Sequence, residues 1–112
     1  MNLDFYNRFK QSIELMDKMG EEYAIARQKS YHSQEMSKVI LARLMLAQGE
    51  IPVSRAEISA RASKDYEQHI IETAEAIRNE QAIKNKLEVA KAKFEGNRSL
   101  CSYEKRTQDL TE

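Results

Sequence analysis

Apolar side chains recur three and four positions apart along the first half of the chain, with polar side chains between them. Residues 3–47 contain no proline and a single glycine, Gly20. Spacing of three and four residues is the period of one face of an α-helix, and no strand-like alternation competes with it. We therefore expect a long helix here. The stripe that it should bury is Phe5, Phe9, Met16, Met19, Tyr23, Ala26, Ser30, Ser33, Ser37, Ile40 and Leu44.

The only proline of the chain lies in the next segment, "GEIPVS", which predicts a turn. Gly49 suits the position just past a helix end, and Pro52 is tolerated in a turn but not inside a helix. Ser54 and Glu57 have the spacing of a capping box, in which each side chain accepts from the other residue's backbone N–H. A second helix therefore follows the turn. Its apolar stripe is Ile58, Ala62, Tyr66, Ile70, Ala74, Ile77, Ile83, Leu87, Ala90 and Phe94.

Three places could interrupt these helices. Gly20 costs about 1 kcal/mol relative to alanine in a helix interior, and we expect the first helix to continue through it. Ser63 offers a second cap, at which the later helix could restart. Gly96 and Asn97 both tolerate the left-handed conformation that ends helices, so they predict a stop. Residues 98–112 are then a short helix or a tail.

These elements predict an all-α protein of one domain, residues 1–112, folded as a long antiparallel helical hairpin with coiled-coil-like packing. Helices of about 40 residues are about 60 Å long, and two of them share a seam rather than a globular core. We expect the uncovered apolar side chains to drive self-association into a bundle, first of all a dimer. A polar, weakly packed midsection is the alternative. The expected helix bounds are 3–47 and 55–95 around a turn at 48–54, and the candidate self-association seam is Phe9, Met16, Tyr23, Ile40, Leu44, Ile70, Ile77 and Leu87.

Composition supports a helical, non-membrane protein. Charged residues make up 32% of the chain, and no apolar run approaches the roughly 20 residues that span a bilayer. The amino terminus is too polar for a signal peptide, and the single cysteine, Cys101, excludes an intrachain disulfide. We expect a cytoplasmic protein.

The sequence holds no grouping that predicts catalysis. His32 and Glu35 share a helix face, but one such pair falls short of a di-iron set, and His69 lies far along the chain. A phosphate-binding loop would need more glycines and a Lys-Ser/Thr pair, and no nucleophile lies at a strand-to-helix turn. We expect no enzyme, no metal, no cofactor and no small-molecule substrate.

Basic residues gather between residues 78 and 106, where the net charge is about +4 by count, although the whole chain is neutral. Lys84, Lys91 and Arg98 are seven residues apart and share one helix face. Basic side chains beside aromatic rings can bind single-stranded nucleic acid, whereas solvated charge is the commoner meaning of such a pattern. The candidate nucleic-acid or partner face is Lys84, Lys86, Lys91, Lys93, Phe94 and Arg98.

Two stretches, "SRAEISARASKDYEQ" and "KLEVAKAKFEGNRS", resemble small helical-hairpin proteins of tailed bacteriophages and prophages. The resemblance covers residues 22–99. Genes of that family often lie near those for single-strand annealing recombination, so it implies a bacterial host cytoplasm and a DNA-related setting. It implies no catalytic residue.

Three functions follow as hypotheses, all of them resting on contact with protein. The first is a phage accessory protein that assists DNA recombination or replication, with weak contact to single-stranded DNA. The second is a helical inhibitor of a host defence or transcription protein. The third is a structural coiled-coil adaptor that self-associates.

Overall fold

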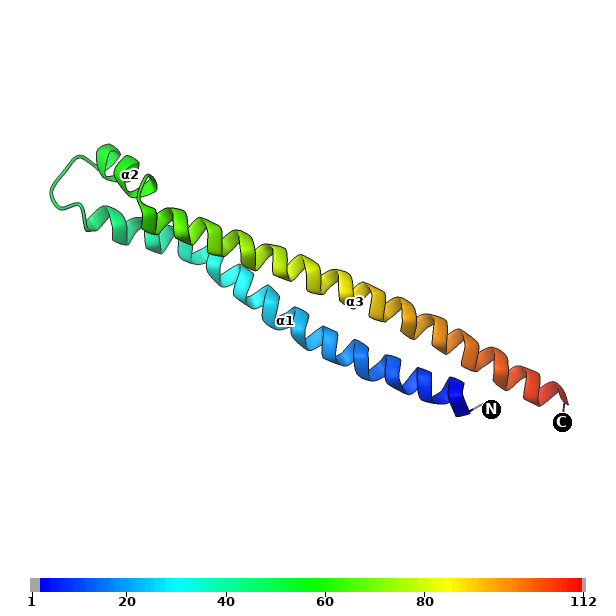
Figure 1. The fold of residues 1–112 in the computed structure, drawn as a ribbon. Coiled ribbons are helices and arrows are strands. Elements are labelled where there is room, and N and C mark those ends of the chain that lie inside the picture. The colour runs from blue at the N-terminus through cyan, green and yellow to red at the C-terminus, as the bar shows by residue number, and fades with distance from the viewer. Residues whose placement is uncertain (1–2, 112) are drawn as a thin grey trace. The chain divides into compact units, whose positions relative to one another are not determined.

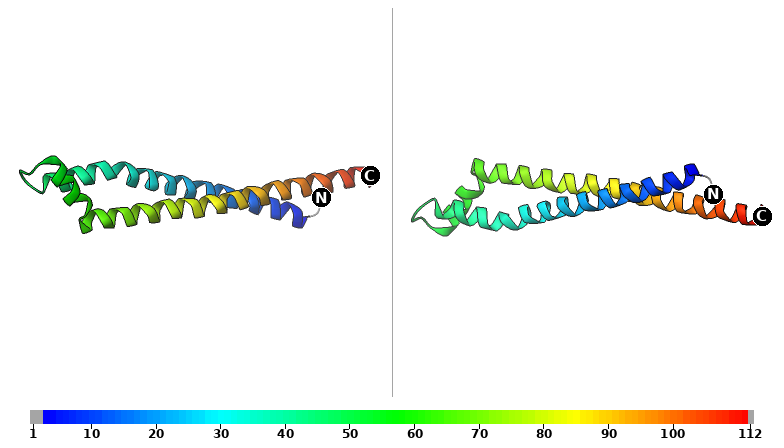
Figure 2. Two further views of the ribbon diagram at one scale, coloured as in Figure 1. Left: turned by 90° about the horizontal axis from the view of Figure 1, so that it is seen from above. Right: turned by 90° about the horizontal axis from the view of Figure 1, so that it is seen from below.

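The computed structural model describes residues 3–111, which form three helices and no strand (Figure 1). Helix α1 is Leu3–Leu46, α2 is Val53–Arg61 and α3 is Lys64–Thr111. Helices α1 and α3 run in opposite directions (Figure 2). The prediction of an all-α helical hairpin is therefore confirmed.

Contacts divide the chain into two compact units, each containing part of α1 and part of α3. Unit 1 comprises residues 1–24 and 81–112, and unit 2 comprises residues 25–80. Helix α2 belongs to unit 2.

Aromatic stacking and one large aliphatic side chain hold unit 1 together. The rings of Phe9 and Phe94 stack with centroids 5.4 Å apart. Leu87, two helical turns before Phe94 on α3, is buried. Cys101 Sγ donates a hydrogen bond to the carbonyl of Phe5 at 3.5 Å. Burying a leucine side chain is worth about 1.5–3 kcal/mol, so this unit has an ordinary apolar seam.

Small and polar side chains fill the seam of unit 2. Ala26, Ser30 and Ala76 are buried, and His69 is 8% exposed. Ser37 Oγ and His69 Nε2 form a hydrogen bond of 2.8 Å between α1 and α3. Because these side chains are short, this part of the seam buries little apolar area per turn of helix. The larger side chains of Ile40 and Leu44 are half-buried further along α1.

The inward residues of α3 follow a strict alternation of three and four, and the stripe of α1 from Phe5 to Leu44 has the same spacing. In α3 every position that is not fully exposed, from Tyr66 to Gln108, obeys it, which is the heptad pattern of a coiled coil. The pairing of α1 with α3 has the same register in both units. Cys101 pairs with Phe5 in unit 1, and His69 pairs with Ser37 in unit 2. The two residues on α1 are separated by the same number of positions as the two residues on α3. The inward residues of α3 are Tyr66, His69, Thr73, Ala76, Glu80, Ile83, Leu87, Ala90, Phe94, Asn97, Cys101, Glu104 and Gln108.

The predicted stripe of α1 lies at these inward positions, and buried Ser12 joins it. The stripe predicted for the second helix is wrong at Ile58 and Ala62, which are exposed, and again between residues 70 and 77. Ile70 and Ile77 are 52% and 38% exposed, whereas His69 and Ala76, one position earlier, face inward. The apolar residues were expected inside, but the heptad phase set by the rest of α3 places them outside.

Two of the expected helix ends also differ. Ser54 and Glu57 form no capping box, since α2 starts after Pro52 without a side-chain cap and Glu57 binds Arg61 at 3.0 Å. The stop expected at Gly96–Asn97 is absent, and the helix expected to end near residue 95 continues to Thr111. Asn97 takes an inward position instead, and its Nδ2 donates to the carbonyl of Arg8 at 3.5 Å.

The helix bounds confirm the continuity expected at Gly20 and answer the question left open at Ser63, where the single helix expected over 55–95 is interrupted. Helix α1 runs through Gly20 without a break. A new helix begins after Ser63, whose Oγ accepts from the backbone N–H of Tyr66 at 3.2 Å. Ser63 is therefore the cap that Ser54 is not.

Replacing the glycines with alanine should have opposite effects according to position. Gly20 and Gly96 lie inside helices with nothing within 4 Å of an added Cβ, so each alanine should stabilise the fold by about 1 kcal/mol. Gly49 has φ of 83°, which costs an L-residue about 1–2 kcal/mol, so Gly49→Ala should destabilise it. Urea unfolding followed by circular dichroism measures all three. A destabilising Gly96→Ala would contradict the continuous α3.

Candidate interaction surface

Two rows of side chains flank the inward positions of α3, one on each side. We call the first the isoleucine–lysine row; it consists of Ile70, Ile77, Lys84, Lys91, Arg98 and Lys105. We call the second the acid–base row; it consists of Asp65, Glu72, Asn79, Lys86 and Lys93. All these residues are exposed, and each is seven positions from the next in its row, so each row follows one helix face.

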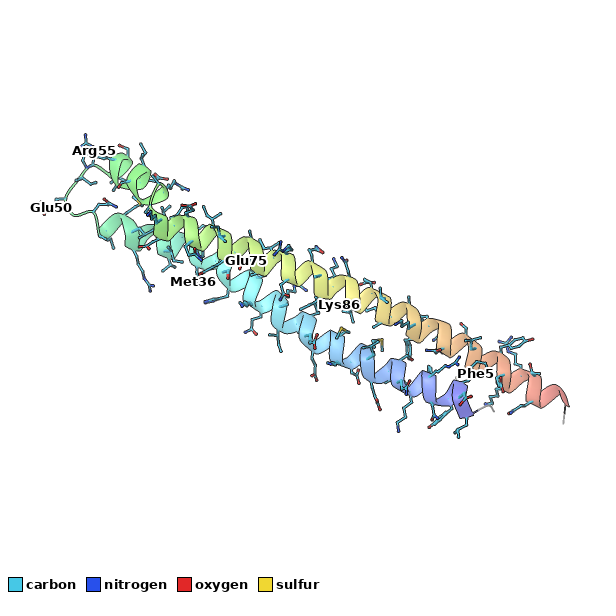
Figure 3. All side chains as sticks on the ribbon, in the orientation of Figure 1. Phe5, Met36, Glu50, Arg55, Glu75 and Lys86 are labelled. Atoms are coloured by element: carbon cyan, nitrogen blue, oxygen red, sulfur yellow. The ribbon has the colours of Figure 1, made fainter. Side chains whose placement is uncertain are left out.

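The six residues of the expected nucleic-acid or partner face do not lie on one face. Lys84, Lys91 and Arg98 belong to the isoleucine–lysine row, and Lys86 and Lys93 to the acid–base row. Figure 3 marks Lys86 on α3. Phe94 faces inward and stacks on Phe9, so its ring is not available to a nucleic-acid base.

Glutamates on α3 neutralise part of the isoleucine–lysine row. Lys91 Nζ lies 3.7 Å from Glu88 Oε1, and Arg98 Nη2 lies 2.9 Å from Glu95 Oε2. Both pairs are more than half exposed, so they contribute little to stability. They do lower the positive potential that a phosphate backbone would meet along this row.

An apolar groove lies between α1 and α3 in unit 1. Leu15, Met19, Val89 and Ala90 line it together with Lys86, Lys93 and Asn85, and its volume is about 430 Å³. Leu15 is 37% exposed and Val89 is 55% exposed. The groove thus joins exposed apolar surface to the basic half of the acid–base row.

Most residues of the expected self-association seam lie between α1 and α3 of the same chain. Leu87 is buried and five others are half-buried at inward positions: Phe9, Met16, Tyr23, Ile40 and Leu44. Of the eight residues of that seam, Ile70 and Ile77 are the two whose side chains are exposed to contact with another molecule. Any association must therefore use the outer faces of the helices.

Large apolar side chains also lie on those outer faces, as the sequence predicts for apolar residues outside the two stripes. Ile25, Val39, Ile71 and Val89 are between 40% and 67% exposed. Their heptad positions, once the phase is known, place them outside.

Two residues considered for chemistry, His69 and Cys101, lie buried at inward positions of α3. No set of three His, Cys, Asp or Glu side chains that could hold a metal ion occurs in the described residues. His69 is hydrogen-bonded to Ser37 and lies 3.4 Å from Thr73 Oγ1, and Cys101 is buried. No helix within the described range is long and apolar enough to cross a membrane.

Comparison with known proteins identifies no relative. No protein-family model, curated protein or solved structure matches the chain. The surface itself is therefore the basis of any functional argument.

Removing one partner of the Ser37–His69 pair should lower the free energy of unfolding more than removing both partners does. Ser37→Ala leaves the buried His69 Nε2 with only the longer contact to Thr73 Oγ1, at 3.4 Å, and should destabilise the fold by about 1 kcal/mol. Adding His69→Leu replaces the polar pair with apolar side chains and should restore or exceed the original stability. Thermal unfolding of the single and double variants measures this coupling. A double variant as unstable as the sum of the singles would contradict it.

Proposed function

We propose that this protein is a non-enzymatic helical scaffold that acts by protein–protein contact, and that a second copy of the chain is its first partner. The observation that carries the proposal is the apolar surface exposed within each unit. In unit 1, Leu15 and Val89 are 37% and 55% exposed, and in unit 2, Ile25, Ile70 and Ile71 are between 45% and 67% exposed. Exposed apolar surface rimmed by polar residues marks sites of protein–protein contact.

The distribution of apolar side chains supports the same proposal. In unit 2 the inward positions of α3 hold Thr73 and Ala76, while Ile70, Ile71 and Ile77 are exposed. A pair of helices that stood alone would gain more free energy with the isoleucines inside. The arrangement suits a chain whose outer faces are buried in an assembly.

The resemblance to phage helical-hairpin proteins supplies the proposed setting. In that setting the scaffold would be an accessory protein of a phage or prophage, working beside DNA recombination or replication in a bacterial cytoplasm. A helical inhibitor of a host protein and a structural adaptor are variants of the same contact-based role, and both would use the same outer faces.

Contact with single-stranded nucleic acid is the second candidate. It is favoured by one observation, the line of four cations Lys84, Lys91, Arg98 and Lys105, with Tyr103 70% exposed beside it in sequence. A ring at that exposure can stack on a base. The ion pairs with Glu88 and Glu95 weaken this candidate relative to the first.

Light scattering with and without a single-stranded oligonucleotide tests both candidates. We expect a mass of at least two chains at micromolar concentration, unchanged by the oligonucleotide, because protein contact supplies the association. A mass that rises with the oligonucleotide and falls again with salt would favour nucleic-acid binding. A single-chain mass at every concentration would overturn self-contact.

A further inference from the structure

The acid–base row of α3 has a charge sequence that complements itself when reversed. Reading along the helix, it contains two acids (Asp65 and Glu72), then the neutral Asn79, then two bases (Lys86 and Lys93). Each is seven residues from the next, and all five are exposed. Two copies of such a row placed antiparallel, with Asn79 opposite Asn79, set every acid against a base.

Among the described residues, the four charges of this row form no ion pair. The pairs Arg61–Glu57, Lys91–Glu88 and Arg98–Glu95 all involve other residues. Glu72 accepts a hydrogen bond from Gln68 Nε2 at 3.2 Å. The charges of the row are therefore exposed and available to another molecule.

Each half of the row borders a groove in its own unit. The basic half lines the apolar groove of unit 1, which exposes Leu15 and Val89. The acidic half borders a more polar groove of about 390 Å³ in unit 2, lined by Glu72, Asn79, Lys29, Ser33, Glu75 and Ala76. A helix that followed the row would thus meet both charge and concave surface.

We propose that a second copy of this chain docks along the acid–base row, with the two α3 helices antiparallel. Asp65 lies opposite Lys93 of the second copy and Glu72 opposite its Lys86, and the two-fold symmetry repeats both pairs. The inference rests on the proposed function, and it adds the face and the direction of the contact.

Charge complementarity favours an antiparallel second copy of the chain over other partners. A parallel copy would set acids on acids, and a uniformly acidic or basic partner would match only half of the row. Exposed ion pairs contribute little free energy individually, so their role is to choose orientation and register. Leu15 and Val89 supply apolar area beside them.

Charge reversal tests the proposal by sedimentation equilibrium at low salt. The variants are Asp65→Lys with Glu72→Lys, and Lys86→Glu with Lys93→Glu. Each turns all cross-copy pairs repulsive, so each should raise the dissociation constant by roughly tenfold or more. Two rescues should restore association: mixing the two variants, which pairs unlike rows, and combining all four substitutions, which inverts the pattern but keeps its self-complementarity.

The matched control is Lys84→Glu with Lys91→Glu. It makes the same charge change at the same spacing on the same helix, but in the isoleucine–lysine row, and should leave the dissociation constant within about twofold. Circular dichroism checks that every variant keeps the helix content of the original chain.

The outcomes separate this inference from the proposed function. Association that responds to the control as much as to the reversals, or that neither rescue restores, overturns the acid–base contact and leaves a different face, such as Ile70 and Ile77, to carry self-contact. A chain that is monomeric before any substitution overturns both. The antiparallel α3 contact is supported if both reversal variants lose self-association and both rescues restore it.

Discussion

The structure depends on the regular spacing of three and four residues that keeps α1 and α3 in contact. In unit 2 the side chains at that contact are mostly alanine, serine and threonine, so the attraction comes from many close dispersion contacts and from the Ser37–His69 hydrogen bond. In unit 1, Phe9, Phe94 and Leu87 add ordinary apolar burial. Because the spacing decides what is inside, isoleucines that fall out of phase are left in water.

That exclusion gives α3 two flanks of different chemistry. The isoleucine–lysine row changes from apolar to basic along the helix, and glutamates one turn away neutralise part of its charge. The acid–base row changes from acidic to basic, and its charges form no ion pair among the described residues. The two flanks of α3 therefore differ in how far their charges are balanced by neighbours on the same helix.

Much of this architecture could be read from the sequence, because helical periodicity is strong where apolar residues are regular. The stripe of α1 from Phe5 to Leu44 was predictable for that reason. The break before Ser63 was not, because periodicity alone predicted one helix over 55–95 and the cap at Ser63 was an open alternative. The phase of α3 near Ile70 was not, since it depends on polar His69 and Thr73 being inside, which local hydrophobicity cannot indicate. The helix through Gly96 was missed because packing of the following turn, where Cys101 meets Phe5, outweighs the glycine's preference for a helix end.

The candidate surface was partly predictable for the same reason. The seven-residue spacing of Lys84, Lys91 and Arg98 is visible in the sequence, but the inward position of Phe94 follows only from its stacking on Phe9. Whether an exposed charge is paired also depends on side-chain geometry, as Glu88 and Glu95 illustrate.

The buried thiol of Cys101 has a practical consequence. It is the only thiol in the chain, it is 9% exposed, and it contacts the backbone of Phe5 near the start of α1. A reagent that alkylates cysteine can reach it only when that end of α1 moves away from α3. The rate of alkylation therefore reports on local opening of unit 1, and mass spectrometry can measure it without any engineered label.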